Sequence, residues 1–301
     1  MLMNRFLILL ICLLIRVVAL AQPVAAINTP SRSATEPTTP GRINATESPV
    51  YIKVYGLYGF LTPGVQISHG ELQSPDGSVF TFKTTNKGLG AGLRAGAGIG
   101  IIVSDFINLG IDADMLFGSD LKISNSYNGG DNTYTSLATT TLKVVSVIPN
   151  ITFKALSRPA YYIYNRLGLV GGIVLDYKSI DAGDDIPKVG VATTSSANYN
   201  YTKNSLALGY QAALGIQFRL SQNLRGFAEV VAYNQSFKPK RLEFSTTSNI
   251  SGQPVTSPIT TTEFTDQGIL VGASNTQTGQ LERFNVSMNS IGIGVGLSFR
   301  F

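Results

Sequence analysis

The C-terminal segment, residues 289–301, alternates strictly between large apolar side chains and small or polar ones. The large set is Ile291, Ile293, Val295, Leu297, Phe299 and Phe301, and between them stand Ser290, Gly292, Gly294, Gly296, Ser298 and Arg300. Successive side chains of a β-strand point to opposite faces, so the segment predicts a strand with one apolar face and one nearly empty face. Glycine gains nothing by facing bulk water, so we expect the small face to line a narrow interior. The large face is then expected to contact lipid, over the about 9–11 residues of a membrane-spanning strand.

Seven further segments repeat this period of two, and together with the C-terminal one they make eight. They are residues 50–60, 89–103, 106–117, 142–153, 159–177, 206–220 and 224–237. In the second segment, Leu89, Ala91 and Leu93 are expected on the lipid face. The fourth is less regular and contains Pro149, a residue that a central strand does not normally hold.

The gaps between these segments are alternately long and short. The long gaps are residues 61–88, 118–141, 178–205 and 238–282, and the short ones are 104–105, 154–158 and 221–223. Short periplasmic turns and long extracellular loops are typical of bacterial transmembrane barrels. The sequence therefore predicts an all-β fold, a transmembrane antiparallel up-and-down β-barrel of eight strands.

Two alternatives to this barrel remain open. Residues 78–84, 242–247 and 268–272 also favour β-structure. We expect them to extend hairpins above the membrane, and a ten-stranded barrel is the alternative. A secreted β-sandwich or calycin-like barrel would bury its apolar faces and leave the glycine-rich faces outside without purpose, so the membrane barrel explains the pattern better.

The N-terminal residues 1–21 read as a signal peptide for export. Arg5 precedes an apolar run from Phe6 to Leu20, and Ala19-Leu20-Ala21 is a small-x-small cleavage site. A membrane anchor is the alternative, but the run is interrupted by Arg16 and is shorter than the roughly 18 apolar residues that an anchor needs. Residues 22–49 are rich in Pro, Thr, Ser and Ala without periodicity, so we expect a disordered periplasmic lead-in before the barrel at residues 50–301.

The terminal Phe301, with Phe299 and Leu297 at alternate positions, resembles the C-terminal assembly signal of Gram-negative outer-membrane β-barrels. From residue 50 onward the chain is similar to small eight-stranded barrels of the OmpA-transmembrane and OmpX kind, as in the porin family of Bacteroidota. It departs from them in its long, Thr-rich fourth loop and in having no Trp. The resemblance implies a bacterial outer-membrane location with loops at the cell surface. It also implies as partners the barrel-assembly machinery, periplasmic chaperones, outer-membrane lipid and lipopolysaccharide, with Phe301 and Phe299 as the assembly signal.

Charged side chains occur on the inward, small-residue faces of the predicted strands. They are Lys53, Arg94, Asp112, Asp114, Arg166, Arg219, Arg225, Glu229 and Arg300. Eight strands leave an interior just wide enough for side chains, and charges with little water around them must pair with one another. We therefore expect a network of salt bridges that fills the lumen. The functional alternative is a selectivity filter.

The sequence contains no recognisable catalytic, cofactor or metal motif. Cys12, the single cysteine, lies in the leader, and Asp112 and Asp114 share a strand face with no third ligand type nearby. The single histidine, His69, falls in the first long gap without a partner at a recognisable spacing. We therefore expect no enzymatic activity. An outer-membrane enzyme that uses His69 is the least favoured of the functional hypotheses.

The charge balance does not favour nucleic acid as a partner. The chain has 23 Lys and Arg residues against 18 acidic ones, and without Arg5 and Arg16 the excess is only +3 (21 − 18). The favoured function is a structural barrel that displays loops for adhesion, envelope integrity, or contact with a host or an unknown surface ligand. The alternative is a small passive pore or transporter for hydrophilic solutes.

Overall fold

The computed structural model describes residues 49–62, 69–73, 79–84, 88–129, 131–158, 160–250, 252–265 and 278–301. They belong to one compact unit, Ser48–Phe301. The predicted signal peptide at 1–21, the lead-in at 22–49 apart from Pro49, and the β-prone segment at 268–272 lie outside the described residues. Within the described part of the chain, no helix is long and apolar enough to cross a membrane.

All the regular elements in these residues are strands. They are β1 (Val50–Leu61), β2 (His69–Gln73), β3 (Val79–Thr84), β4 (Gly92–Ile102), β5 (Ile107–Gly118), β6 (Leu121–Asn128), β7 (Asn132–Ser157), β8 (Tyr161–Pro187), β9 (Thr193–Asn204), β10 (Ala207–Arg219), β11 (Leu224–Phe237), β12 (Pro239–Ile250), β13 (Gln253–Thr256), β14 (Thr260–Thr265), β15 (Thr278–Glu282), β16 (Val286–Ser287) and β17 (Ser290–Arg300).

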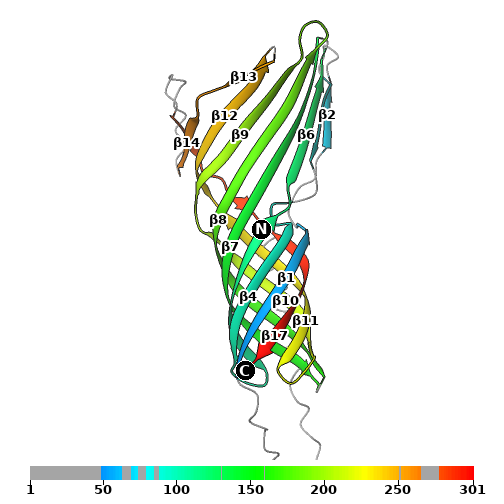
Figure 1. Ribbon diagram of the computed structural model, residues 1–301, viewed down its shortest axis with the longest axis vertical. Coiled ribbons are helices and arrows are strands. Elements are labelled where there is room, and N and C mark those ends of the chain that lie inside the picture. Colours follow the sequence, from blue (N-terminus) through cyan, green and yellow to red (C-terminus); the bar gives the residue numbers. More distant parts are fainter. Residues whose placement is uncertain are drawn as a thin grey trace, which may run out of the picture. The chain divides into compact units, whose positions relative to one another are not determined.

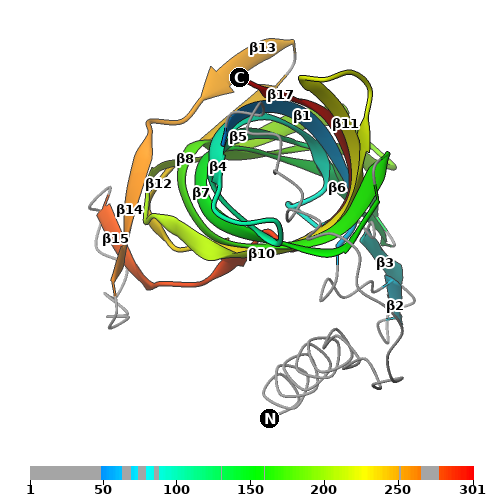
Figure 2. The same ribbon diagram turned by 90° about the horizontal axis from the view of Figure 1, so that it is seen from below.

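Eight of these strands close into a barrel. Antiparallel pairing runs in the order β1, β4, β5, β7, β8, β10, β11 and β17, and β17 returns to β1 with Tyr51 opposite Arg300. The closed ring is seen end-on in Figure 2. This ring confirms the predicted transmembrane up-and-down barrel, and closure leaves none of its eight strands with an unpaired edge inside the hydrocarbon layer. We call the end with the short connections at 103–106, 158–160 and 220–223 the turn end.

The outer surface of the barrel is an apolar belt. Outward side chains such as Leu169, Leu214, Ile293 and Val295 are 55–70% exposed in the isolated chain. Such exposure would be costly in water, but the same side chains match the lipid face of a transmembrane barrel. Lipid contact therefore explains why a chain with this composition carries its large aliphatic residues outside.

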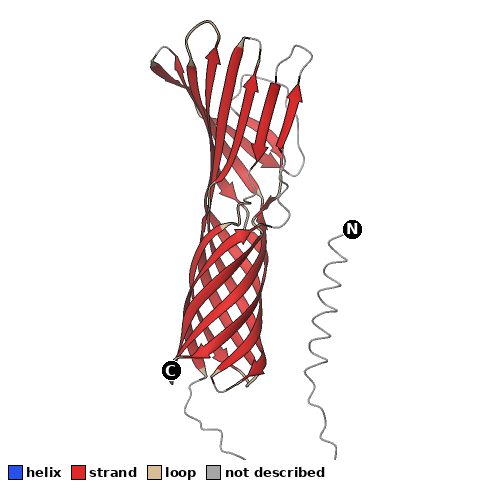
Figure 3. Ribbon diagram, turned by 90° about the vertical axis from the view of Figure 1, so that its right-hand side faces the viewer, coloured by secondary structure: helices blue, strands red, loops and turns tan. Residues whose placement is uncertain are grey.

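An extension of the same sheet rises from one side of the barrel, away from the turn end (Figures 1 and 3). We call it the upper sheet. It consists of the extended ends of β7 and β8, flanked on one side by β6, β3 and β2 and on the other by β9, β12, β13, β14 and β15. The pairs are antiparallel except β14 with β15, which is parallel.

The upper sheet corrects the prediction of long loops. Most described residues of the gaps at 118–141, 178–205 and 238–282 are strand, and β7 and β8 run well beyond the predicted 142–153 and 159–177. These segments are rich in Thr, Tyr and Ser. They become strands because a neighbouring extended segment pairs with them through backbone hydrogen bonds, which the sequence pattern does not reveal. The expectation that 78–84 and 242–247 would extend hairpins without adding spans is confirmed, because β3 and β12 pair outside the ring.

Pro149 is accommodated inside β7. It pairs with Ile111 of β5, whereas the pairing of β7 with β8 is interrupted at residues 148–149, between Val147 opposite Gly171 and Asn150 opposite Gly168. A residue without an N–H therefore stands where the ladder toward β8 is already broken. The side chain is exposed on the outer face.

Candidate functional site

The barrel interior is filled by aromatic side chains that lie against glycines of other strands. A Cβ added to Gly96 would lie 2.6 Å from the ring of Tyr55, and one added to Gly215 would lie 2.5 Å from the ring of Tyr164. Gly296 stands in the same relation to the ring of Phe227. The glycine-rich inner faces predicted from the sequence therefore make room for large rings.

The centre of the interior is an ion-pair network around Arg166. Its Nη1 lies 3.1 Å from Asp112 Oδ2, and its Nη2 lies 2.5 Å from Glu229 Oε1. Lys53 Nζ shares Asp112 Oδ2 at 2.8 Å, and the Tyr164 hydroxyl donates to Glu229 Oε2 at 2.9 Å. All four charged side chains are at most 8% exposed. Strands β1, β5, β8 and β11 each contribute one of them, so the network ties the barrel together across its interior.

Arg94 and Asp114 form a second pair, farther from the turn end. Arg94 Nη1 donates to Asp114 Oδ1 at 3.1 Å, and the guanidinium lies over the Tyr233 ring at 4.1 Å. The Tyr233 hydroxyl donates to the other carboxylate oxygen, Asp114 Oδ2, at 2.8 Å. The salt bridge and the cation–π contact together compensate the buried charge of Arg94 in part, since its Nε and Nη2 have no hydrogen-bond partner among the described residues.

Three other predicted lumen residues lie near the turn end. Arg300 is buried, and its side chain is hydrogen bonded to Tyr162. Arg225 is half-buried, with its guanidinium 6.0 Å from the Tyr162 ring. Arg219 is exposed, because β10 ends at this residue. The structure therefore brings together Lys53, Arg94, Asp112, Asp114, Arg166 and Glu229, places Arg300 and Arg225 below them, and leaves Arg219 outside at the rim.

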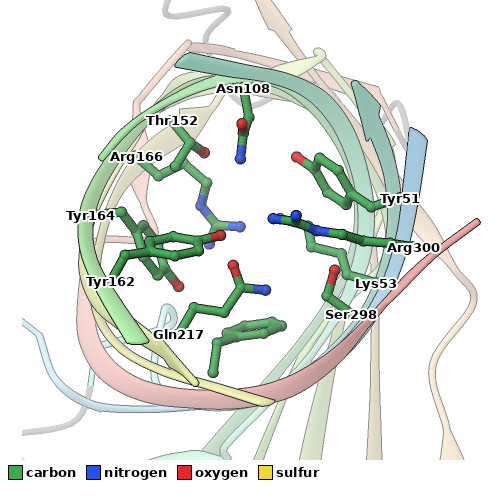
Figure 4. Close-up of a pocket in the computed structure, with 11 residues that line it drawn as sticks. Tyr51, Lys53, Asn108, Thr152, Tyr162, Tyr164, Arg166, Gln217, Ser298 and Arg300 are labelled. Atoms are coloured by element: carbon green, nitrogen blue, oxygen red, sulfur yellow. The ribbon is translucent and has the colours of Figure 1, made fainter. Parts of the chain in front are cut away.

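A small cavity separates the ion network from the turn end (Figure 4). Its volume is about 40 Å³, and Lys53, Arg166, Arg300, Tyr51 and Tyr162 contribute to its lining. Since one water needs roughly 10–15 Å³ of such space, the cavity holds about three water-sized groups. It is too small to serve as a vestibule for a hydrophilic solute.

Two apolar layers close the interior on the other side of the ion network. The first consists of Leu57, Ile148, Val170, Ala213, Val231 and Tyr233. The second, which we call the plug, consists of Leu89, Leu116, Leu142, Val144, Tyr177, Ala207, Phe237, Val286 and Met288. Leu116, Val144 and Met288 are completely buried. Together the charged and apolar layers block the interior at several levels.

The plug includes residues that the sequence pattern misplaced or missed. Leu89 and Ala91 were expected on the lipid face, but both are buried. Strand β4 begins only at Gly92, whose φ of +128° turns the preceding residues inward. The sequence pattern missed Val286 and Met288, which lie just before β17. Their apolar character was the only sequence signal that could have identified them.

The described residues contain no group of three or more His, Cys, Asp or Glu side chains that could hold a metal ion. His69 is the first residue of β2, where it pairs with Lys83. Its backbone is therefore at one edge of the upper sheet rather than in the barrel.

Comparisons with known proteins show similarity only at the level of solved structures. No protein-family model matches the sequence, and a search of curated proteins finds no significant relative. The chain is similar to the outer membrane protein OprG from Pseudomonas aeruginosa, at 11% identity and a TM-score of 0.33, over 85% of this chain and 97% of that one. It is also similar to the outer membrane protease OmpT from Escherichia coli, at 10% identity and a TM-score of 0.32, over 84% of this chain and 94% of that one. At these values the likeness carries no argument about activity, and the fold assignment stands on the closed strand pairing and the apolar belt.

Proposed function

We propose that the protein is an integral β-barrel of a bacterial outer membrane that has no open pore and displays the upper sheet at the cell surface. Its role is structural or adhesive, through contact of this sheet with a ligand or a neighbouring surface. The observation that carries the proposal is the filled interior, in which the Arg166 network, the apolar layer and the plug follow one another along the barrel axis. A barrel blocked in this way has its accessible polar surface above the membrane.

The upper sheet has the character of a recognition surface. A hollow of about 550 Å³ on it is lined mainly by small polar side chains of β8, β9 and β12, among them Asp184, Thr194, Ser196 and Asn249. Neighbouring strands place these groups side by side, with Asp184 opposite Thr194 and Asn249 opposite Thr194 on the other side. This size lies within the range of small-molecule sites, about 300–1,000 Å³. The display role therefore has a surface on which a polar ligand can bind.

The passive pore is the alternative, and single-channel recording in a planar bilayer separates the two. We expect no stable conductance from the full chain. A variant with the plug opened, Met288→Gly, serves as the comparison, and it too should stay silent because the apolar layer at Ile148 and Val231 remains. Large, stable openings of the wild-type protein would overturn the closed-barrel proposal and support the pore.

Display is tested with an epitope inserted between β8 and β9, at residues 188–192. Antibody should label intact cells that express this variant. A matched insertion in the turn at 221–223 should be labelled only after the outer membrane is permeabilised. Labelling of intact cells through the 221–223 epitope alone would mean that the barrel has the opposite orientation and that the upper sheet is not displayed.

A further inference from the structure

The connection between β8 and β9 exposes aliphatic side chains at one end of the upper sheet. Val189 is 92% exposed, Val191 is 68% exposed, and Ile186, near the end of β8, is 54% exposed. The segment 189–192 contains no polar side chain. We call residues 186–192 the tip. Single exposed aliphatic residues are normal on any protein, whereas a group of them marks a contact surface.

The membrane around the barrel does not cover the tip. Figures 1 and 3 show the connection between β8 and β9 at the end of the upper sheet that is far from the turn end. The part of β8 that lies in the upper sheet, residues 178–187, is about 33 Å long at about 3.3 Å per residue. Lipid of the same membrane explains the apolar belt of the barrel, so a different partner has to account for the tip.

The tip is held in place by neighbouring residues. The Lys188 backbone N–H donates to the Asp131 carbonyl at 2.8 Å, and Asn132 Nδ2 donates to Asp185 Oδ1 at 2.9 Å. Gly190 has a φ of +127°, a conformation that favours glycine and turns the chain back toward β9. A projection that is already ordered loses little conformational freedom when it makes a contact.

The shape and composition of the tip favour a lipid bilayer over other partners. Sites for small molecules are concave, whereas the tip projects from the end of the sheet (Figure 3). Energetically dominant residues of protein interfaces are enriched in Trp, Tyr and Arg, and Val is under-represented among them. Residues 186–192 include two valines and one isoleucine but no Trp, Tyr or Arg. Aliphatic side chains gain free energy in hydrocarbon without a pocket of matching shape.

The charges behind the tip indicate which kind of bilayer it fits. Among the described residues at this end of the sheet, the carboxylates of Asp131, Asp184 and Asp185 outnumber the single ammonium group of Lys188. Asp185 is about 7 Å behind Pro187, the last residue of β8, at about 3.3 Å per residue. A segment that enters the boundary between headgroups and acyl chains by about 5–10 Å would therefore keep these carboxylates among the headgroups. Their negative charge opposes anionic lipids and matches choline, the outermost charged group of phosphatidylcholine.

We propose that the tip inserts into the surface layer of a second membrane that is rich in zwitterionic phosphatidylcholine. Ile186, Val189 and Val191 enter the acyl boundary, and the long Lys188 side chain reaches back to the phosphate groups. The proposal names a partner for the upper sheet. It rests on the proposed display role, since only a sheet outside the cell meets another membrane.

The test measures co-sedimentation of the full chain, held in nanodiscs, with sucrose-loaded vesicles of phosphatidylcholine. The wild-type protein should sediment with these vesicles, and phosphatidylglycerol mixed into them should weaken the binding. Val189→Ser combined with Val191→Ser should weaken it at least about tenfold, because methyl groups are withdrawn from the hydrocarbon. The control combines Ile259→Ser with Leu281→Ser, two aliphatic residues outside the tip that are 62% and 48% exposed, and it should bind like the wild type.

A polarity-sensitive fluorophore on Ala192→Cys reports insertion directly, once the only cysteine, Cys12, is replaced by serine. Its emission should shift to the blue on phosphatidylcholine vesicles and be quenched by brominated acyl chains. No binding, no blue shift, or equal losses in the two double variants would overturn the proposal. Binding only to vesicles that carry membrane proteins would assign the tip to a protein partner and overturn it as well. Orientation in the cell does not enter this assay, so the display role is tested separately by the epitope experiment.

Discussion

Replacement of Arg166 by methionine should destabilise the barrel strongly, because two buried carboxylates depend on this side chain. Arg166 is 3% exposed and is paired with Asp112 and Glu229. Removing one partner of a buried ion pair typically costs about 3–5 kcal/mol of unfolding free energy, since it leaves a buried charge uncompensated. Methionine keeps most of the volume, so packing contributes little to this loss.

The two carboxylates should not be affected equally. Asp112 keeps Lys53, whose Nζ lies 2.8 Å from the same oxygen, whereas Glu229 keeps only the hydroxyl of Tyr164 at 2.9 Å. The uncompensated charge is therefore on Glu229. A second replacement, Glu229→Gln, removes that charge and should restore the unfolding free energy of Arg166→Met to within about 1–2 kcal/mol of the wild type. The double variant would then be more stable than the single one.

The assay is equilibrium unfolding in urea with the protein in lipid vesicles. The chain contains no Trp, so circular dichroism and the electrophoretic mobility of the folded barrel are the suitable signals. Arg219→Met is the control, because Arg219 is exposed at the rim, and its cost should stay within about 0.5 kcal/mol. If Arg166→Met proved no more costly than Arg219→Met, the interior would be hydrated and the argument from burial would be wrong.

Three further predictions concern the two faces of the barrel wall and its terminus. Leu214→Arg places a cation in the hydrocarbon and should cost about 2–4 kcal/mol in the same urea assay, and a harmless substitution would contradict the lipid-facing assignment. Gly215→Ser should lower the unfolding free energy by about 1–3 kcal/mol, because the added Cβ would meet the ring of Tyr164. The same substitution in a Tyr164→Ala background should cost less. An equal cost in that background would mean that the contact with Tyr164 is not the cause. Deletion of Phe301, which is 64% exposed, should slow assembly in cells, seen as precursor in the periplasm, while the inserted fraction keeps wild-type resistance to protease. Normal insertion of that variant would remove the terminal residue from the assembly signal.

The ring of eight strands was predictable because the alternation of large and small residues can be seen within each strand separately. Ile293 and Gly294, or Leu214 and Gly215, point to opposite faces whatever the rest of the chain does, so a period of two reveals both the strand and its lipid side. The same alternation placed Asp112, Asp114, Arg166 and Glu229 inside. It could not show which carboxylate meets which cation, since that depends on the stagger of strands far apart in the chain.

The extent of the upper sheet and the register between the strands were decided only by the tertiary structure. Residues 178–187 lack a clear apolar period and become strand because β7 and β9 supply hydrogen bonds on both sides. Leu89 turns inward because the backbone bends at Gly92, and Met288 is buried because Leu89 and Phe237 meet it from other parts of the chain. A local pattern indicates which face of a strand a residue takes, whereas the register of the strands and the pairing within the upper sheet follow from contacts between segments that are distant in sequence.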